Sequence, residues 1–470
     1  MSNYKEIAKH SGNYFFAMVA TKALDFIAIP VYTYLLTVEE YGVFNMFLST
    51  VGIATILLTL NTEVAISRYY FDTDDVIDFK KFVGTNMRLT LAVFFIISLC
   101  MVIGVIPLSS YLNFEYLLTL AIIPVSLYRI VNSIFQQIYQ PLLESRKIAV
   151  VSSVQSYMAF FLSILCIYLL PEKKYYGQVL GTILAMLVVG VYSLRQIKEY
   201  YISGWNLKYV KYILNYSLPY LPYSLSGIII AQLGRLILGR INGFEAAGVY
   251  SFASNISMVM LVLISVVHSA WNPYYFRYMN DKDYTSIDRD YDLIWRVTLF
   301  VGVAVSLFCY EIGNLVGPSE YNTDLHIIPI LVLGYIFYQW AYVYMRNVGY
   351  AKKTIWNAIV VVFSGVVNIL LNAILIAPLG TLGIAVSFSV AYLFMLVLGA
   401  ILNKYVLKCY APKLLSFIKP LVYSTILIIC TIITPFKDCN LGLVLLKSIV
   451  LIVFAVILFW KYKNYILRRS

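Results

Sequence analysis

The sequence is poor in charged residues for its length. Only 12% of its 470 residues are Asp, Glu, Lys or Arg, whereas 61% are hydrophobic and the mean hydropathy is +0.81. A soluble domain is typically about half apolar and about a quarter charged. A water-soluble core of this chain length could not bury so much apolar surface, so the composition excludes a soluble enzyme or binding domain.

Sequence signatures of catalysis, nucleotide binding and metal binding are also missing. The chain has no G-x-x-x-x-G-K-[ST] phosphate loop, no H-E-x-x-H and no G-x-S-x-G, and it has only three histidines. Its six cysteines are scattered, which is typical of small buried side chains rather than of disulfides or a metal cluster. We therefore expect the protein not to be an enzyme, and we expect neither a cofactor nor a bound metal.

Long apolar runs alternate with short polar connectors along the whole chain. About 20 helical residues cross a hydrocarbon core about 30 Å thick. Helices are expected rather than barrel strands because the runs are continuously apolar and do not alternate. The pattern predicts an all-α polytopic membrane protein with about 14 transmembrane helices, at 13–36, 43–67, 83–107, 114–138, 148–170, 177–194, 213–238, 245–268, 292–316, 325–346, 354–377, 381–402, 416–434 and 441–460.

Lysine and arginine are distributed unevenly among the connectors. If the N-terminus is cytoplasmic, all but eight of the 35 Lys and Arg residues fall on the cytoplasmic side, which predicts that both termini are cytoplasmic. These cations are spread one loop at a time, so the net charge of +12 does not indicate nucleic-acid binding. The eight exceptions lie in outside turns or within spans: Lys173, Lys174, Arg240, Lys437, Lys22, Arg129, Arg235 and Lys447.

Two turn motifs recur at one fixed spacing. Gly42 and Gly248 are 206 residues apart, as are Gly177 and Gly383, and all four lie where short outside turns close predicted hairpins. We therefore expect two homologous six-helix lobes related by a parallel duplication, with a central cleft suited to alternating access. The predicted domains are an N-terminal lobe, a C-terminal lobe, and two further helices with a basic cytoplasmic tail, at 1–205, 206–410 and 411–470.

Several ionisable side chains lie within the predicted spans. Each costs at least about 2.5–3.5 kcal/mol at mid-bilayer, so each is a candidate functional residue. Lys22 and Asp25 are one turn apart in the first span, Arg129 lies in the fourth, and Arg235 and Arg240 lie near the outer end of the seventh. A cleft lined by Lys22, Arg129 and Arg235 would be positive and would attract a phosphate or diphosphate, which arginine grips bidentately.

The remaining charges within spans have weaker functional interpretations. Glu63 and His268 lie near the inner ends of the second and eighth spans, which are equivalent in the predicted repeat, and both are candidates for ion or proton coupling. A structural role at the helix end is the alternative for His268. We expect Lys447 in the last span to extend its ammonium group to the interface, and Glu311 to have a structural role.

Five short motifs carry a resemblance to a known family. They are residues 34–44 (YLLTVEEYGVF), 68–70 (RYY), 216–222 (YSLPYLP), 247–251 (AGVYS) and 270–275 (AWNPYY). In their order and positions they resemble the Wzx-type flippases of lipid-linked oligosaccharides, in the MATE-like superfamily of multidrug, oligosaccharidyl-lipid and polysaccharide exporters. The resemblance covers essentially the whole chain in span number and hairpin spacing.

The resemblance implies a fold, a substrate and a location. The fold would be two six-helix lobes in a V, and the substrate an undecaprenyl-diphosphate-linked sugar repeat unit for a surface polysaccharide such as O-antigen or capsule. The protein would lie in the bacterial plasma membrane, among membrane lipids, with polysaccharide polymerase and glycosyltransferases as candidate partners. Lys22, Arg129 and Arg235 would bind the headgroup, with Asp25 as modulator.

Two other functions remain as alternatives. A MATE-type cation or drug antiporter needs carboxylates in its cleft, and Asp25 is the lone acidic candidate here. A membrane polymerase or ligase needs a sizeable outside loop, and the predicted outside turns are all short.

Overall fold

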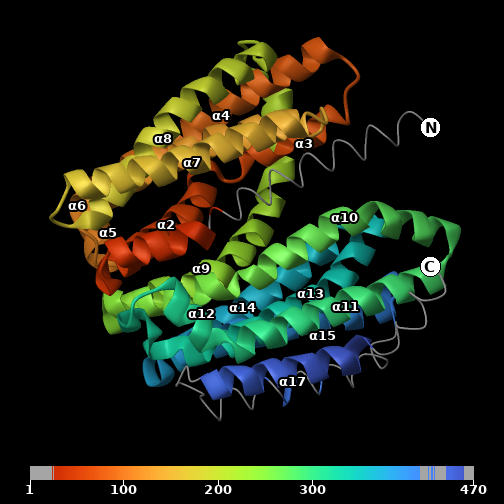
Figure 1. Ribbon diagram of the computed structural model, residues 1–470. Coiled ribbons are helices and arrows are strands. Elements are labelled where there is room, and N and C mark those ends of the chain that lie inside the picture. Colours follow the sequence, from red (N-terminus) through yellow and green to blue (C-terminus); the bar gives the residue numbers. More distant parts are fainter. Residues whose placement is uncertain are drawn as a thin grey trace. The chain divides into compact units, whose positions relative to one another are not determined.

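The computed structural model describes residues 24, 26–412, 422, 425, 426, 428 and 441–459. These residues form helices, turns and connectors, with no strand among them. They divide into two compact units, one ending at Gly248 and the other beginning at Val249 (Figure 1). The predicted lobe boundaries after residues 205 and 410 remain predictions, as does the V-shaped arrangement.

The first unit is built from helices that pack around a core of large aromatic side chains. Phe47, Phe82, Phe135 and Tyr139 in this core are fully buried. Helix α8 packs along both α6 and α7, and α6 also packs against α2 (Figure 1). The elements are α2 (Val38–Thr59), η1 (Thr62–Val64), α3 (Ala65–Tyr70), α4 (Val76–Ile103), α5 (Val105–Leu112), α6 (Tyr116–Tyr139), α7 (Ser145–Leu169), α8 (Lys174–Ile197), η2 (Lys198–Tyr200) and α9 (Leu207–Ser257) as far as Gly248.

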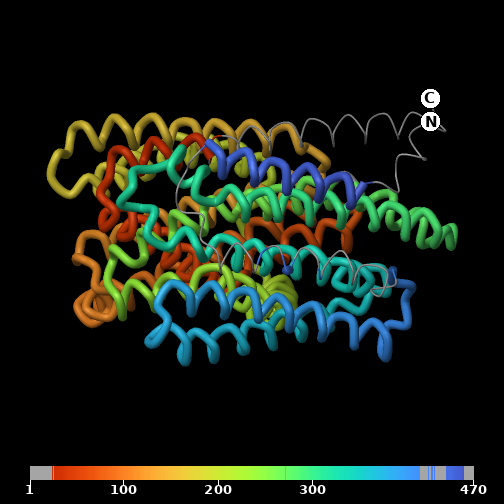
Figure 2. The backbone as a smooth tube through the Cα atoms, turned by 60° about the horizontal axis from the view of Figure 1, so that its bottom comes forward, coloured from red at the N-terminus to blue at the C-terminus, as the bar shows by residue number. Residues whose placement is uncertain are grey.

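The second unit has its own aromatic core. Trp295, Trp340, Tyr291 and Phe252 are fully buried there. Helix α15 packs against α13 and α14, and α17 runs along α11 (Figure 2). The elements after α9 are α10 (Val259–Asp281), α11 (Tyr284–Leu307), α12 (Cys309–Val316), η3 (Ser319–Ile327), α13 (Ile328–Tyr350), α14 (Ile355–Leu379), α15 (Thr381–Leu402), a π-helical turn (Asn403–Leu407) and α17 (Leu441–Phe459).

The described helices confirm the predicted polytopic membrane architecture. Within the described ranges, ten helices are long and apolar enough to cross a membrane, and the pair α11–α12, bent by 66°, makes eleven. One of the ten, Leu207–Ser269, contains both the seventh and eighth predicted spans, which the backbone separates at Gly243. Phe26–Leu35 is the described part of the first predicted span, and most of 416–434 lies outside the described residues. These helices are compatible with about 14 spans.

Several spans that the sequence predicts as continuous are broken, among them the second, third and ninth. The second ends as α2 at Leu60 and Asn61, whose φ angles of 50° and 57° are left-handed, before a short 3₁₀ turn leads into α3. The third is divided into α4 and α5 at Gly104, and the ninth is divided at Phe308. Left-handed backbone is unfavourable for residues with a Cβ, so packing around the break must hold it in place.

Helix α2 begins with a capping box formed by Thr37 and Glu40. The Thr37 hydroxyl accepts a hydrogen bond from the Glu40 amide at 3.2 Å, and the Glu40 carboxylate accepts one from the Thr37 amide at 3.1 Å. This reciprocal pair satisfies two amides that the first helical turn leaves without a partner. The other carboxylate oxygen of Glu40 accepts a hydrogen bond from the Lys174 amide at 2.7 Å, which ties the start of α8 to the start of α2.

Two glycines of the predicted repeat pack directly against each other. A Cβ on Gly42 would lie 2.8 Å from the Gly248 amide nitrogen and would overlap the Phe244 carbonyl oxygen. A Cβ on Gly248 would similarly overlap the Val38 carbonyl. Only glycine permits this approach of α2 and the end of α9. The duplication that the spacing of these glycines suggests remains a prediction.

Candidate substrate-binding site

Arg235 extends from α9 onto the middle of α2. Its side chain is 7% exposed, and its Nη1 donates hydrogen bonds to the Ser49 hydroxyl at 3.2 Å and to Gln232 Oε1 at 3.4 Å. Ser49 also donates to Gln232 Oε1 at 2.8 Å, so the three side chains form one network. Arg235 lies eight residues before the backbone break at Gly243, which is about 12 Å along the helix. The network therefore holds a guanidinium within the apolar part of the span.

Arg129 approaches the same helix from α6. Its Nη1 would lie 3.7 Å from a Cβ built on Gly52, and Ile228 of α9 would lie 2.9 Å from that Cβ. Arg129 is half-buried, and within the described part of the chain it makes neither a hydrogen bond nor an ion pair. It follows the first residue of α6 by 13 positions and precedes the last by ten, so it lies near mid-membrane. A cation at this depth is costly unless it has a function.

The two arginines share one face of α2. Ser49 and Gly52 are three residues apart, so they lie on the same side of the helix about one turn from each other. On α9, Gln232 and Arg235 follow Ile228 at the spacing that also keeps them on one face. Glycine at position 52 leaves room beside the Arg129 guanidinium. Together these residues form the paired-arginine site, defined as Ser49, Gly52, Arg129, Gln232 and Arg235.

The other predicted substrate-binding residues lie elsewhere or are not described. Lys22 and Asp25 fall outside the described residues, so their place is not given by the structure. Arg240 is exposed, and its guanidinium lies over the ring of Tyr111 in α5, 4.0 Å from the ring centre. Arg240 is five residues beyond Arg235, which turns it away from the face that meets Ser49. The structure therefore brings Arg129 and Arg235 together on α2 and places Arg240 apart from them.

Glu63 lies at the break that follows α2. It is 5% exposed, and its Oε2 is buried and has no hydrogen-bond partner in the described part of the chain. Around the break, Thr62 shares a hydrogen bond of 2.8 Å with Thr90, and the Asn86 amide donates to the Thr62 carbonyl at 2.7 Å. A buried carboxylate without a full set of partners is costly. The break therefore places the Glu63 carboxyl next to polar groups of Thr62, Asn86 and Thr90 that are hydrogen-bonded to one another.

His268 belongs to a buried network in the second unit. Arg346 Nη2 lies 2.5 Å from His268 Nδ1, and His268 Nε2 lies 2.8 Å from Gln339 Oε1. A guanidinium can only donate, so Nδ1 accepts and Nε2 carries the proton that it donates to Gln339. The ring also stacks on Tyr342, with 4.0 Å between ring centres. A second proton on His268 would have to displace Arg346.

Aromatic rings surround the Arg346 guanidinium. Its central carbon lies 4.8 Å from the Trp271 ring centre and 5.2 Å from the ring centres of Tyr275 and Tyr342. The side chain is 6% exposed, and no ion pair to it occurs within the described ranges. Cation–π contacts of this kind stabilise a desolvated cation. The sequence places Arg346 among the cytoplasmic connector cations, whereas the structure buries it inside α13.

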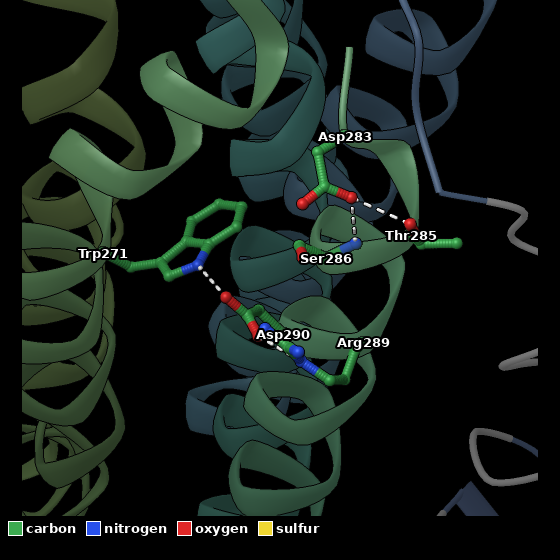
Figure 3. Close-up of polar contacts among 6 residues, drawn as sticks. All are labelled: Trp271, Asp283, Thr285, Ser286, Arg289 and Asp290. Atoms are coloured by element: carbon green, nitrogen blue, oxygen red, sulfur yellow. Dashed lines mark hydrogen bonds and ion pairs between the residues drawn. The ribbon is translucent and has the colours of Figure 1, made fainter. Parts of the chain in front are cut away.

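Figure 3 shows how Trp271 is anchored. Its indole Nε1 donates a hydrogen bond of 3.1 Å to Asp290 of α11, and Arg289 pairs with the same carboxylate at 3.0 Å. Asp283 caps α11 by accepting from the Ser286 amide at 3.1 Å (Figure 3). These contacts hold Trp271 in place beside Arg346, which is hydrogen-bonded to His268.

Lys447 does not extend to the interface, so this expectation is wrong. Its side chain is 3% exposed, and its ammonium nitrogen lies 2.6 Å from Glu311 Oε1. The pair joins α17 to α12 at the bend after α11. In a low-dielectric environment a direct ion pair is more favourable than leaving either charge alone. The partner lies 136 residues earlier in the chain, so the pairing was not visible in the local sequence.

The sequence interpretation missed Ser49 and Gln232. Both are small or neutral polar residues within long apolar helices. Polar side chains within spans often hydrogen-bond between helices, and this is the signal that would have identified them. Their contact spans 183 residues of sequence.

Comparison with known proteins gives one family match and one curated relative. A family model described as "Polysaccharide biosynthesis protein" matches residues 7–279. The curated relative is "Lsg locus putative protein 1" of Haemophilus influenzae, 22% identical over 289 residues, covering 59% of this chain and 68% of the relative.

Solved structures share the fold at low sequence identity. The lipid II flippase MurJ in an inward closed conformation has a TM-score of 0.73 at 14% identity and covers 98% of this chain and 100% of its own. An inward-facing multidrug resistance MATE family transporter of the MOP superfamily has a TM-score of 0.66 at 14% identity, covering 82% and 94%. At these identities the similarity shows the fold alone.

Proposed function

Because the chain belongs to the polysaccharide biosynthesis protein family, we propose that it is a flippase for undecaprenyl-diphosphate-linked oligosaccharide repeat units. It would carry them across the bacterial plasma membrane for surface polysaccharide biosynthesis, by alternating access of a cationic site to the two sides. The fold is that of a polytopic transporter, and the family model together with the sequence motifs supports a Wzx-type member. Both termini would be cytoplasmic.

The paired-arginine site is the observation that carries this proposal. It places two guanidinium groups on one face of α2, about one turn apart, within apolar helices. A diphosphate has two phosphate groups joined by one bridging oxygen, so its charges are spaced for two neighbouring arginines. Arginine binds phosphate through a planar fork, and a charge-assisted hydrogen bond is about twice as strong as a neutral one.

The two arginines would contribute to diphosphate binding in different ways. Arg235 is already oriented by Ser49 and Gln232, which reduces the entropy that binding would cost. Arg129 makes no hydrogen bond within the described part of the chain, so its donors are available to a phosphate. Gly52 has no side chain that would contact the Arg129 guanidinium. The lipid tail would stay in the bilayer while the headgroup crosses, and Lys22, Asp25 and Arg240 remain predicted additions to this site.

Surface polysaccharide in a deletion strain tests the proposal. Complementation with Arg129→Met should leave the protein in the membrane, because Arg129 makes no hydrogen bond or ion pair within the described residues. It should abolish surface polysaccharide, and lipid-linked repeat units should accumulate on the cytoplasmic side. Arg277→Met is the matched control, because Arg277 is exposed and its ion pair in the described part of the chain is with the exposed Asp281, at 3.6 Å. Normal polysaccharide from well-expressed Arg129→Met would contradict the assigned site.

A MATE-type cation or drug antiporter is the second candidate. One observation favours it: Glu63 is a buried carboxylate at a helix break, with one oxygen that lacks a partner in the described chain, and carboxylates suit cationic cargo. Glu63 and His268 remain candidate coupling residues under either function. Drug accumulation in a sensitive strain separates the two functions, because the antiporter predicts resistance that depends on Glu63, whereas the flippase predicts none.

The proposed function also implies partners. Glycosyltransferases must build the repeat unit on the cytoplasmic side before transport, and a polymerase must join repeat units after it. We propose these enzymes, together with the lipid-linked oligosaccharide and membrane lipids, as partners. Deletion of the glycosyltransferases should remove the accumulated intermediate in the Arg129→Met strain.

A further inference from the structure

The first unit has a pocket on its surface that the proposed transport does not use. It has a volume of about 490 Å³ and lies where the connector between α6 and α7 meets α8. Two cations, Arg146 and Lys147, line it together with Glu144, and its apolar lining includes Leu143, Val150 and Tyr192. We propose that this pocket binds an anionic glycerophospholipid of the surrounding leaflet, with its phosphate at Arg146 and an acyl chain along the apolar lining.

The charges of the pocket leave one cation available. Lys147 is bound to Glu144, with 2.7 Å between its ammonium nitrogen and the carboxylate, and it also lies 4.8 Å from the ring centre of Tyr139. Arg146 is exposed and makes no hydrogen bond or ion pair within the part of the chain that the structure describes. The three charged side chains that line the pocket therefore sum to +1, and the Arg146 guanidinium carries this charge, which complements a headgroup of net charge −1.

The depth of the pocket matches the boundary between headgroups and acyl chains. Helix α7 has 25 residues, about 37 Å, which exceeds a hydrocarbon core of about 30 Å, so its first turn reaches the headgroups. Arg146 lies in this first turn, and Val150 lies one turn deeper. Tyr192 lies five residues before the end of α8, where tyrosines typically mark the interface.

The apolar part of the pocket is exposed. Leu143 is 67% exposed, Val150 is 53% exposed and Tyr192 is 48% exposed. These side chains would gain nothing from headgroups or water, whereas an acyl chain would cover them. Arg146 lies one helical turn before Val150, toward the start of α7. The pocket thus has a cation at one end and apolar side chains at the other, just as a phospholipid has a charged headgroup followed by acyl chains. This match favours a bilayer lipid over a free phosphate as the ligand.

Native mass spectrometry of the purified full-length chain tests the site. The protein is titrated with phosphatidylglycerol or with phosphatidylcholine of identical acyl chains. Arg146→Gln should weaken the tightest phosphatidylglycerol binding about five-fold and leave phosphatidylcholine binding unchanged, since one basic side chain near an anionic headgroup has about this effect. Arg277→Gln, which removes an exposed cation outside the pocket, should change neither.

A second pair of variants tests the apolar lining without changing charge. Val150→Trp should fill the pocket and weaken binding of both lipids, whereas Val154→Trp, at a similarly exposed position one turn deeper and outside the lining, should not. All four positions are exposed, and unchanged melting temperatures verify that the variants fold. Equal phosphatidylglycerol affinity of wild type and Arg146→Gln would overturn the proposal. Arg146-dependent binding of undecaprenyl phosphate but not of phosphatidylglycerol would also overturn it, in favour of a substrate-loading site.

Discussion

Replacing Arg235 separates substrate recognition from folding. Arg235→Met keeps the length of the side chain and removes its charge. Ser49 and Gln232 stay hydrogen-bonded to each other at 2.8 Å in this variant, so their contact survives the substitution. Replacing a buried charged side chain with an apolar one of similar volume also removes the cost of keeping that charge away from water. We therefore expect normal amounts of Arg235→Met in the membrane.

The magnitude of the binding defect follows from the lost contacts. A hydrogen bond to a charged group contributes about 1.5–3 kcal/mol. With Arg235 at 7% exposure, little water would replace the lost phosphate contact. Arg235→Met should therefore weaken binding of an undecaprenyl-diphosphate-linked sugar about 10- to 150-fold. Arg235→Lys keeps the charge but loses the planar fork, so its defect should be smaller, about ten-fold or less.

Affinity for the lipid-linked diphosphate is measured with purified protein in detergent, by fluorescence or thermophoresis. Arg277→Met is the control for loss of one exposed arginine. The ranking wild type, Arg235→Lys, Arg235→Met is the expected result. Equal affinities for wild type and Arg235→Met, in protein with an unchanged melting temperature, would refute the assignment of Arg235 to the headgroup.

Three further predictions concern stability, measured as the melting temperature in detergent. Gly42→Ala should lower the free energy of unfolding by about 1–3 kcal/mol, because the new Cβ would overlap the backbone of α9. An unchanged melting temperature would contradict this close packing. Lys447→Met should lower the free energy of unfolding by about 3–5 kcal/mol, because it leaves Glu311 without its cation. Adding Glu311→Gln should restore most of this loss. If the effects of the two substitutions simply add, the ion pair does not couple the two residues. The pKa of Glu115 is lowered chiefly by the hydrogen bond from Lys173, so its stabilising contribution is present at neutral pH and lost as the pH falls through that lowered pKa. Glu115→Gln should therefore cost up to about 2 °C at pH 7, for this exposed pair, and the difference should close in acid.

The membrane architecture was predictable because bilayer thickness fixes the length of an apolar span. Helices α6, α7 and α8 lie within a few residues of the predicted 114–138, 148–170 and 177–194. The breaks at Asn61 and Phe308 were not predictable, because the sequence remains apolar across them or close to them. They depend on tertiary contacts, such as the hydrogen bond between Thr62 and Thr90, that join residues far apart in sequence.

The candidate site was predictable only in part. Arg129 and Arg235 could be identified from the sequence because a charged side chain within an apolar span is costly and is therefore rarely present without a function. Their common position on α2 could not be inferred, because it depends on how α6 and α9 pack. Ser49 and Gln232 gave too weak a signal alone, since neutral polar residues in spans are common. Arg346 was misassigned to a connector because its place near a helix end resembles that of an interfacial cation.

Transport of a labelled undecaprenyl-diphosphate-linked oligosaccharide in proteoliposomes tests whether the protein is a flippase that uses the paired-arginine site. The label on the outer leaflet is quenched or cleaved, and protein-dependent movement of label between leaflets is followed in time. We expect movement with the wild type and with Arg277→Met, and none with the double variant Arg129→Met, Arg235→Met. Equal movement with the double variant, or drug transport by a wild type that leaves the lipid in place, would contradict this expectation.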